Sequence, residues 1–335
     1  MKGLIKDAAA AAEKIDKLNR LRTLSGVLVT KESPKEEETP EVILVDLEKL
    51  TPKEMLQGYA DFLADYATAP FDADGNKLNM FKGEWTIWSG FPGAGKTTII
   101  KQSIAHLLRS GEKVFSFSGE SRPEHFVINL AATAAGVLMP TENHLNWFLD
   151  QYHDKLKLWG IIGQARHKQL LATIRDLADE GVTHAFIDSL MCLDIEEGDN
   201  EAHRQFANLI TATVKAKKIH IHLVAHPRKP KDSSQEPSQN DVAGSANLSR
   251  LCDNILFVRR GPDEMGLPGV TPMMIDILKQ RERGILGQIQ GYYYREFRQF
   301  QFTPHMHAPT QYLPPAAYVD AQFDEPIPKE LECPF

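Results

Sequence analysis

The sequence predicts an α/β protein whose core is a mostly parallel, twisted sheet with helices on both faces. From about residue 80, short apolar runs alternate with stretches of helical periodicity. One of the apolar runs leads directly into a glycine-rich segment that opens an amphipathic helix. Strands that alternate with helices in this way favour a parallel sheet that is covered on both faces.

Each element of this core is expected from a local pattern. The expected strands are Trp85–Ser89, Val114–Ser118, His184–Asp188, Ile219–Ala225, Asn254–Val258 and Met273–Leu278. A helix is expected over Thr97–Arg109, because its apolar residues share one face and Gly111 follows as a stop. A second helix is expected over Glu201–Lys217, begun by Asp199 or Asn200.

The 335 residues fit either two domains or one large domain with appendages. We expect a core over residues 79–301, preceded by a helical and linker segment over residues 1–78 and followed by a flexible, acidic, proline-rich tail over residues 302–335. Within the first segment, Thr51, Pro52 and Glu54 have the spacing of a helix start with a capping box.

Composition excludes several classes of protein. No apolar run approaches the ~20 residues of a membrane span, and the charged start does not look like a signal peptide. We therefore expect a cytoplasmic protein without a membrane partner, located in the bacterial host cell if it is phage-encoded. The distant cysteines Cys192, Cys252 and Cys333 argue against a zinc site or a disulfide framework. The net charge of −7 argues against coating of DNA over the whole surface, although basic residues gathered in one channel can still bind it.

The strongest motif is the segment GFPGAGKT at residues 90–97, which matches GxxxxGK[ST] between an expected strand and an expected helix. Its glycines allow a tight loop whose backbone N–H groups surround phosphates. Lys96 is expected to reach the β- and γ-phosphates, and the Thr97 hydroxyl to bind Mg²⁺. The motif predicts a site for ATP or another nucleoside triphosphate, formed by Gly90, Phe91, Pro92, Gly93, Ala94, Gly95, Lys96, Thr97 and Thr98.

Two carboxylates end expected strands and complete this site. Asp188 follows an apolar strand and is interpreted as the second Mg²⁺-side group. Glu120 follows another strand and is interpreted as the residue that orients or deprotonates the attacking water. The carboxyl ends of strands in such a sheet share one rim, so both groups can face the γ-phosphate. The alternative interpretation of each carboxylate is that it caps the helix that follows it.

At this point the sequence resembles a known family. The segment GEWTIWSGFPGAGKT at residues 83–97 resembles the RecA-like motor of replicative DNA helicases. The segment LVAHPRK at residues 223–229, then GSA at 244–246 and CDNIL at 252–256, is similar to the Twinkle and phage primase-helicase group, and more distantly to the DnaB-like helicases. The resemblance covers roughly residues 80–300, and residues 1–78 hold no cysteine cluster. We therefore expect the motor without a primase activity.

The resemblance implies roles for residues beyond the phosphate loop. His226 matches a polar residue that senses the γ-phosphate, and the segment after it matches a DNA-binding loop in which Arg228, Lys229 and Lys231 contact single-stranded DNA. A solvated charged loop is the alternative. The three cations lie within four residues and can neutralise phosphates.

The resemblance also implies that one subunit completes the ATP site of the next. Arg281 matches an arginine finger and Lys279 its companion, with Arg283 as an alternative finger. Here the sequence departs from the family, because Glu282, Ile285 and Leu286 replace small or polar residues.

Arg260 and Tyr294 match the positions that sandwich the nucleotide base. Tyr292 and Tyr293 compete for that role, and a tyrosine packed on the sheet is the alternative.

The resulting expectation is an ATP-dependent hexameric replicative helicase that translocates on single-stranded DNA and unwinds duplex. The alternatives are a RecA- or RadA-like recombinase, a regulatory RecA-fold DNA-dependent ATPase, and a non-catalytic loader. The acidic tip ending in Pro334 and Phe335 resembles that of single-stranded DNA-binding proteins, which suggests docking on a replisome protein such as a primase, a polymerase or a DNA-binding protein; a solvated tail is the alternative.

Overall fold

The structure is a computed structural model that describes residues 51–71, 78–160, 163–227, 237–242, 246–262, 269–302 and 308–320. Its centre is a nine-stranded sheet in the order β11-β10-β9-β8-β3-β7-β6-β4-β5. The strands from β8 to β5 pair in parallel, and β9, β10 and β11 add an antiparallel edge. The strands are β3 (Trp85–Gly90), β4 (Val114–Ser118), β5 (Leu156–Leu158), β6 (His184–Asp188), β7 (His220–Val224), β8 (Asn254–Arg260), β9 (Val270–Gln280), β10 (Gly287–Tyr294) and β11 (Gln299–Gln301).

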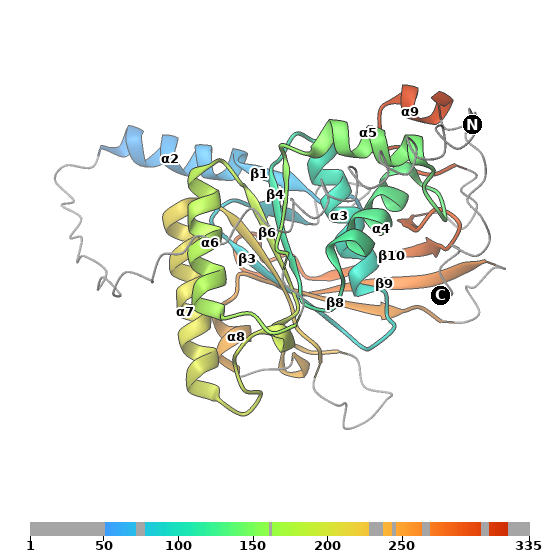
Figure 1. The fold of residues 1–335 in the computed structure, drawn as a ribbon. Helices are drawn as coiled ribbons and strands as arrows, with labels where there is room; N and C mark the ends of the chain where they lie inside the picture. Colours follow the sequence, from blue (N-terminus) through green and yellow to red (C-terminus); the bar gives the residue numbers. More distant parts are fainter. Residues whose placement is uncertain are drawn as a thin grey trace, which may run out of the picture.

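Helices cover both faces of this sheet (Figure 1). One apolar core lies under α3 (Lys96–Arg109), α4 (Pro123–Ala135) and α5 (Glu142–Tyr152). The other lies under α6 (His167–Asp179), α7 (Asn200–Lys217) and α8 (Ala246–Leu251). The predicted α/β class and the mostly parallel sheet are therefore confirmed. Within the described residues, no helix is long and apolar enough to cross a membrane.

The local patterns located the central elements well. Strands β4 and β6 have the predicted bounds, and α7 begins at the predicted cap, where the Asp199 side chain accepts from the N–H groups of Glu201 and Ala202. Helix α2 (Pro52–Ala64) has the predicted capping box between Thr51 and Glu54. The expected helix near the N-terminus and the acidic tip near Phe335 lie outside the described residues.

Residues outside the expected core of 79–301 pack against it at both ends. The short strand β1 (Tyr66–Thr68) pairs with β2 (Asn79–Phe81), and Phe71 beyond it is fully buried. At the other end, Tyr312, Leu313 and Ala317 are buried in the core under α5, although residues from 302 onward were expected to form a flexible tail. The hydroxyl of Tyr152 donates to the Tyr312 carbonyl at 2.6 Å. Tyr312 and Leu313, together with Ala317 of α9 (Pro315–Asp320), are thus part of the packed core.

Three fully buried histidines lie side by side on strands β6 and β7, and their hydrogen bonds determine their tautomers. The Trp88 indole N–H donates to His222 Nδ1 at 3.2 Å. A neutral His222 must then carry its proton on Nε2 and donate it to His184 Nδ1, also at 3.2 Å. His220 Nδ1 donates to the Phe81 carbonyl at 2.7 Å. Burial lowers the pKa of all three, to about 4 for His220, so the native protein holds them neutral.

We predict that these histidines make the fold sensitive to acid. Below the unfolded pKa of ~6.5 the unfolded chain binds protons that the native chain excludes, so stability falls as pH falls. The unfolding free energy of the wild type should decrease between pH 7 and pH 5.5. In His184→Gln this decrease should be smaller by ~1.2 kcal/mol. Denaturant titrations at both pH values measure this difference. The control is His153→Gln, which removes an exposed histidine outside this buried group. Equal pH dependence in the wild type and His184→Gln would mean that His184 takes up protons in the native protein as readily as in the unfolded chain.

Candidate active site

The predicted phosphate loop connects β3 to α3 and depends on a close strand contact. Gly90, the last residue of β3, pairs with Val258 of β8. A Cβ on Gly90 would lie 2.2 Å from the Val258 carbonyl oxygen, and its φ of +147° is one that other residues rarely adopt. Gly95, with φ +92°, is the residue before α3 and contributes no side-chain cap. Gly95 thus offers no side-chain acceptor to the first N–H groups of α3. These N–H groups can instead donate to an anion bound at the start of the helix.

Lys96 crosses this loop from the first turn of α3. Its ammonium donates to the carbonyl oxygens of Gly90 at 2.6 Å and Phe91 at 3.0 Å. Burial lowers the pKa of Lys96, and the charges of Asp188 and Glu120 oppose that shift. The loop thus places a buried cation within reach of two carboxylates.

The structure brings the predicted acidic groups to the same rim. Asp188 ends β6, is 6% exposed and is hydrogen-bonded to the Thr97 side chain. Burial and the nearby Glu120 charge raise the pKa of Asp188 to about 6. The Glu120 side chain is 59% exposed, and its Oε1 lies 4.0 Å from His226 Nε2. The Ser189 hydroxyl also donates to Glu120, at 3.4 Å.

These oxygen groups fit a magnesium ion that is shared with a bound phosphate. Within the described residues, no group of three or more histidine, cysteine or acidic side chains gathers to hold a metal alone. Mg²⁺ typically takes one or two protein ligands and completes its shell with water and substrate phosphates. The neighbouring Thr97 hydroxyl and Asp188 carboxylate supply that kind of partial donor set.

Sequence reasoning missed a second lysine near this site. Lys101 lies one helical turn after Thr97, with its ammonium 5.9 Å from the centre of the Phe126 ring. Burial and the Arg298 charge lower the pKa of Lys101 to about 8, whereas Asp188 opposes the shift. The four-residue spacing from Thr97 was a visible signal, because it places both side chains on one face of α3.

The two residues expected to sandwich the base have different environments. Arg260 ends β8 on the loop side of the sheet and is exposed. Tyr294 is 4% exposed, and its ring stacks on Phe297 with centroids 5.6 Å apart, so it packs within the protein instead of offering a face to a base. The competing Tyr293 is only partly buried and is hydrogen-bonded to Thr98, the residue after Thr97. The geometry thus favours Tyr293 over Tyr294.

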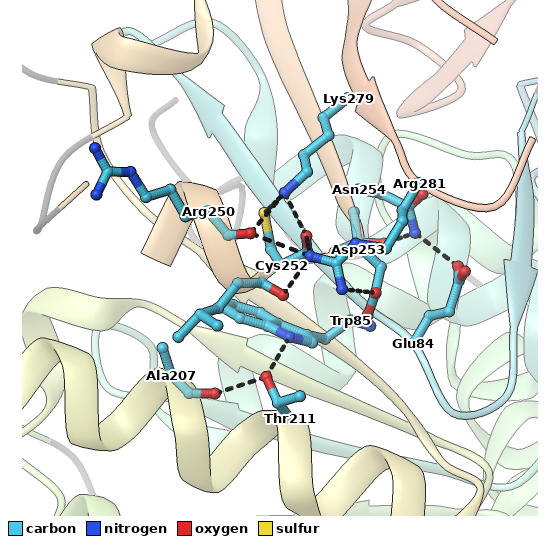
Figure 2. A network of polar contacts seen from close by, with 12 residues as sticks. Glu84, Trp85, Ala207, Thr211, Arg250, Cys252, Asp253, Asn254, Lys279 and Arg281 are labelled. Atoms are coloured by element: carbon cyan, nitrogen blue, oxygen red, sulfur yellow. Dashed lines mark hydrogen bonds and ion pairs between the residues drawn. The ribbon is translucent and has the colours of Figure 1, made fainter. Parts of the chain in front are cut away.

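Lys279 and Arg281 lie at the other end of the strands from the phosphate loop. Asn254, the first residue of β8, pairs with Gln280 and with Thr86 near the start of β3, whereas the loop begins at Gly90. Figure 2 shows both cations directed toward the end of α8. The five residue steps from Trp85 to Gly90 correspond to ~17 Å of strand. Lys279 and Arg281 therefore do not join Lys96 in one chain.

The expected DNA contacts Arg228, Lys229 and Lys231 lie outside the described residues, but both flanks are placed. Pro227 follows His226 and forms an isolated bridge with Val242. On the far side, the Gln239 side-chain amide donates to the Leu278 carbonyl at 2.7 Å. One flank thus adjoins Glu120, and the other adjoins the strand that carries Lys279.

Comparison with known proteins agrees with this geometry. Residues 76–232 match a family described as AAA domain. The solved ATPase domain of G40P superposes with a TM-score of 0.59 at 14% identity, covering 75% of this chain and 98% of that one. A DnaB-like replicative helicase, solved in a study of its interactions with primase, gives a TM-score of 0.62 at 14% identity, covering 76% of this chain and 68% of that one. The core is DnaB-like in fold. The resemblance inferred from the motifs is thereby confirmed at the level of fold. The residues that match the AAA domain family include Lys96, Glu120 and Asp188.

We predict that Gly90 tolerates substitution far less well than Gly93 in the same loop. Gly93 also has a positive φ, of +72°, but a Cβ there meets no atom within 4 Å. Gly93→Ala should therefore lower the unfolding free energy by only ~1 kcal/mol, which is the cost of the backbone conformation. Gly90→Ala adds a clash with Val258 and should cost at least ~3 kcal/mol. Denaturant unfolding of the two variants checks this, and equal costs would show that β3 and β8 separate easily at Gly90.

Proposed function

We propose that this protein is an ATP-driven DNA helicase motor that works as a ring of identical subunits, a hexamer, and moves along single-stranded DNA to unwind duplex. The observation that carries the proposal is the division of the predicted machinery between two ends of the sheet. Lys96, Asp188 and Glu120 gather at one rim, whereas Lys279 and Arg281 lie at the other. A site that needs all five residues requires two chains.

The chemistry follows from the groups at the rim. Lys96 would leave the Gly90 and Phe91 carbonyls and donate to phosphate oxygens, and Thr97 with Asp188 would hold Mg²⁺, which neutralises phosphate charge. Glu120 is partly exposed and would accept the proton of the attacking water. His226, 4.0 Å from Glu120, would report the state of the site to the DNA-binding segment that follows it. Arg281 of the next chain would stabilise charge on the γ-phosphoryl oxygens.

The exposed apolar side chains support a head-to-tail assembly, which needs two different surfaces. On the Arg281 side, helix α2 buries none of its residues, and Met55, Leu56 and Tyr59 are 57%, 72% and 55% exposed. The Tyr59 hydroxyl donates to Glu282 at 3.0 Å, which connects α2 to the turn that carries Arg281. On the loop side, Met191 is 71% exposed just beyond Asp188. Burying these surfaces against each other would bring Arg281 toward a neighbouring phosphate loop.

We predict that Glu120→Gln keeps ATP binding but loses most turnover, because the amide cannot accept the water proton. Wild-type protein should hydrolyse ATP faster with single-stranded DNA and displace a strand from a forked duplex. Steady-state ATPase, nucleotide binding and unwinding assays measure these properties. Turnover of Glu120→Gln within a few-fold of wild type would show that Glu120 does not accept the proton of the attacking water. DNA-stimulated ATPase without strand displacement would favour a recombinase or a regulatory ATPase.

We also predict that DNA binding depends on the segment after His226. Neutralising Arg228, Lys229 and Lys231 together should weaken binding to single strands of any sequence. It should also flatten the plot of log affinity against log salt by ~0.7 for each lost phosphate contact. The matched control removes the same charge from Arg109, Lys113 and Lys218, which are exposed at the other end of the strands. If both triple variants show the same salt dependence, the DNA path lies elsewhere.

A further inference from the structure

The turn that follows β9 carries a guanidinium that is held by several contacts from its own chain (Figure 2). Arg281 Nη2 donates to the carbonyls of Arg250, Leu251 and Cys252, at 3.1, 3.2 and 3.2 Å. Its Nη1 lies 3.1 Å from Asp253 Oδ1, and its backbone N–H donates to the Asp253 carbonyl at 2.9 Å. These contacts fix one edge of the guanidinium plane.

The rest of the Arg281 side chain faces outward. It is 48% exposed, although so many of its contacts are internal. A guanidinium has five N–H donors, and in the described residues no hydrogen bond from Nε is present. The side chain is therefore oriented by one edge while the remaining donors can reach a group outside this chain.

Asp253 is the buried centre of this arrangement. Its side chain is 2% exposed, and each carboxylate oxygen has a separate partner. Oδ1 pairs with Arg281, and Oδ2 accepts the backbone N–H of Trp85 at 3.1 Å. Trp85 begins β3, the buried strand that ends at the phosphate loop. Asp253 thus joins the Arg281 turn to the start of a fully buried strand.

Lys279 uses the same carbonyl-rich end of α8. Its ammonium donates to the carbonyls of Ser249, Arg250 and Cys252, at 2.8, 3.0 and 2.7 Å. Two cations therefore share the Arg250 and Cys252 carbonyls. Of these two cations, only Arg281 also pairs with a buried carboxylate. The orientation of the Arg281 guanidinium therefore depends on Asp253, whereas the Lys279 ammonium is held by carbonyl oxygens.

We propose that Asp253 is a positioning residue that aims Arg281 at the ATP site of the neighbouring chain. Without the carboxylate charge, the guanidinium keeps the carbonyl contacts but loses the partner that sets its plane. Misplacement of a catalytic group by ~1 Å can cost ~100-fold in rate. The inference rests on the proposed two-chain site.

The test uses pairs of inactive variants in mixed rings. One chain carries Arg281→Ala and keeps a sound phosphate loop, and the other carries Lys96→Ala and keeps a sound Arg281. Only an interface that combines the first chain's loop with the second chain's Arg281 can hydrolyse ATP. Asp253→Asn is then added to either chain, because asparagine still offers an oxygen to the Trp85 N–H.

The expected result is asymmetric. Asp253→Asn in the chain that supplies Arg281 should lower turnover ~10- to 100-fold without changing ATP affinity. In the chain that supplies the loop it should change turnover less than ~2-fold, because that chain has no Arg281 to aim. A merely structural role would lower turnover in both placements.

The control is Asp276→Asn, which breaks another aspartate–arginine pair, in this case between strands β9 and β8. Asp276 Oδ2 lies 2.6 Å from Arg259 Nε, away from the Arg281 turn. Asp276→Asn should have the same effect on turnover in either chain. If Asp253→Asn does not assemble, Asp253→Ser replaces it, since a hydroxyl oxygen can still accept the Trp85 N–H.

Equal effects of Asp253→Asn in the two placements would overturn the positioning role. If the parent mixture regains no ATPase despite proven co-assembly, the two-chain site itself is wrong. The two failures are therefore distinguishable.

Discussion

Strand β3 is the constraint on which the rest of the site depends, because its two ends hold two different parts of the machinery. All of its residues are buried, and it is paired with β7 on one side and β8 on the other. At its end, the absence of a side chain at Gly90 lets the phosphate loop leave the sheet beside Val258. At its start, the Trp85 N–H is held by the carboxylate that also pairs with Arg281. The length of this strand therefore sets the separation between the loop and Arg281.

That separation has a consequence for how the protein works. Because this separation keeps Arg281 away from the loop of its own chain, the complete site that we propose would be assembled from two chains. We propose that helix α2 contributes to this assembly, because its exposed apolar side chains adjoin the Arg281 turn through the Tyr59–Glu282 hydrogen bond. ATP hydrolysis would then depend on how neighbouring chains are oriented. A motor requires such coupling between hydrolysis and the movement of its subunits.

Much of the fold was predictable because it is encoded locally. The apolar runs identified β4 and β6, and the Thr51 capping box and the Asp199 cap identified the starts of α2 and α7. The loop residues around Lys96 were predictable because phosphate binding requires a short glycine-rich spacing. Glu120 and Asp188 could be brought together by topology alone, since the ends of parallel strands share a rim.

What escaped prediction depends on contacts between distant segments. Tyr312 and Leu313 are buried by packing under α5, which no pattern in the proline-rich segment reveals. Tyr294 cannot be distinguished from Tyr293 by composition, and only the pairing of β10 with its neighbours decides which ring is buried. Asp253 looked like part of a family motif, and its role became visible only when Trp85, 168 residues away in sequence, was found on its other oxygen.

The central claim is that each ATP site is shared between two chains. A structure of the assembled protein with single-stranded DNA and a non-hydrolysable ATP analogue measures this directly, through the distance between the Arg281 guanidinium and the γ-phosphate in the adjacent chain. We expect a contact at hydrogen-bond distance, ~3 Å, with Arg281 still paired to Asp253 of its own chain. An assembly in which Arg281 remains more than ~10 Å from every nucleotide would contradict the account.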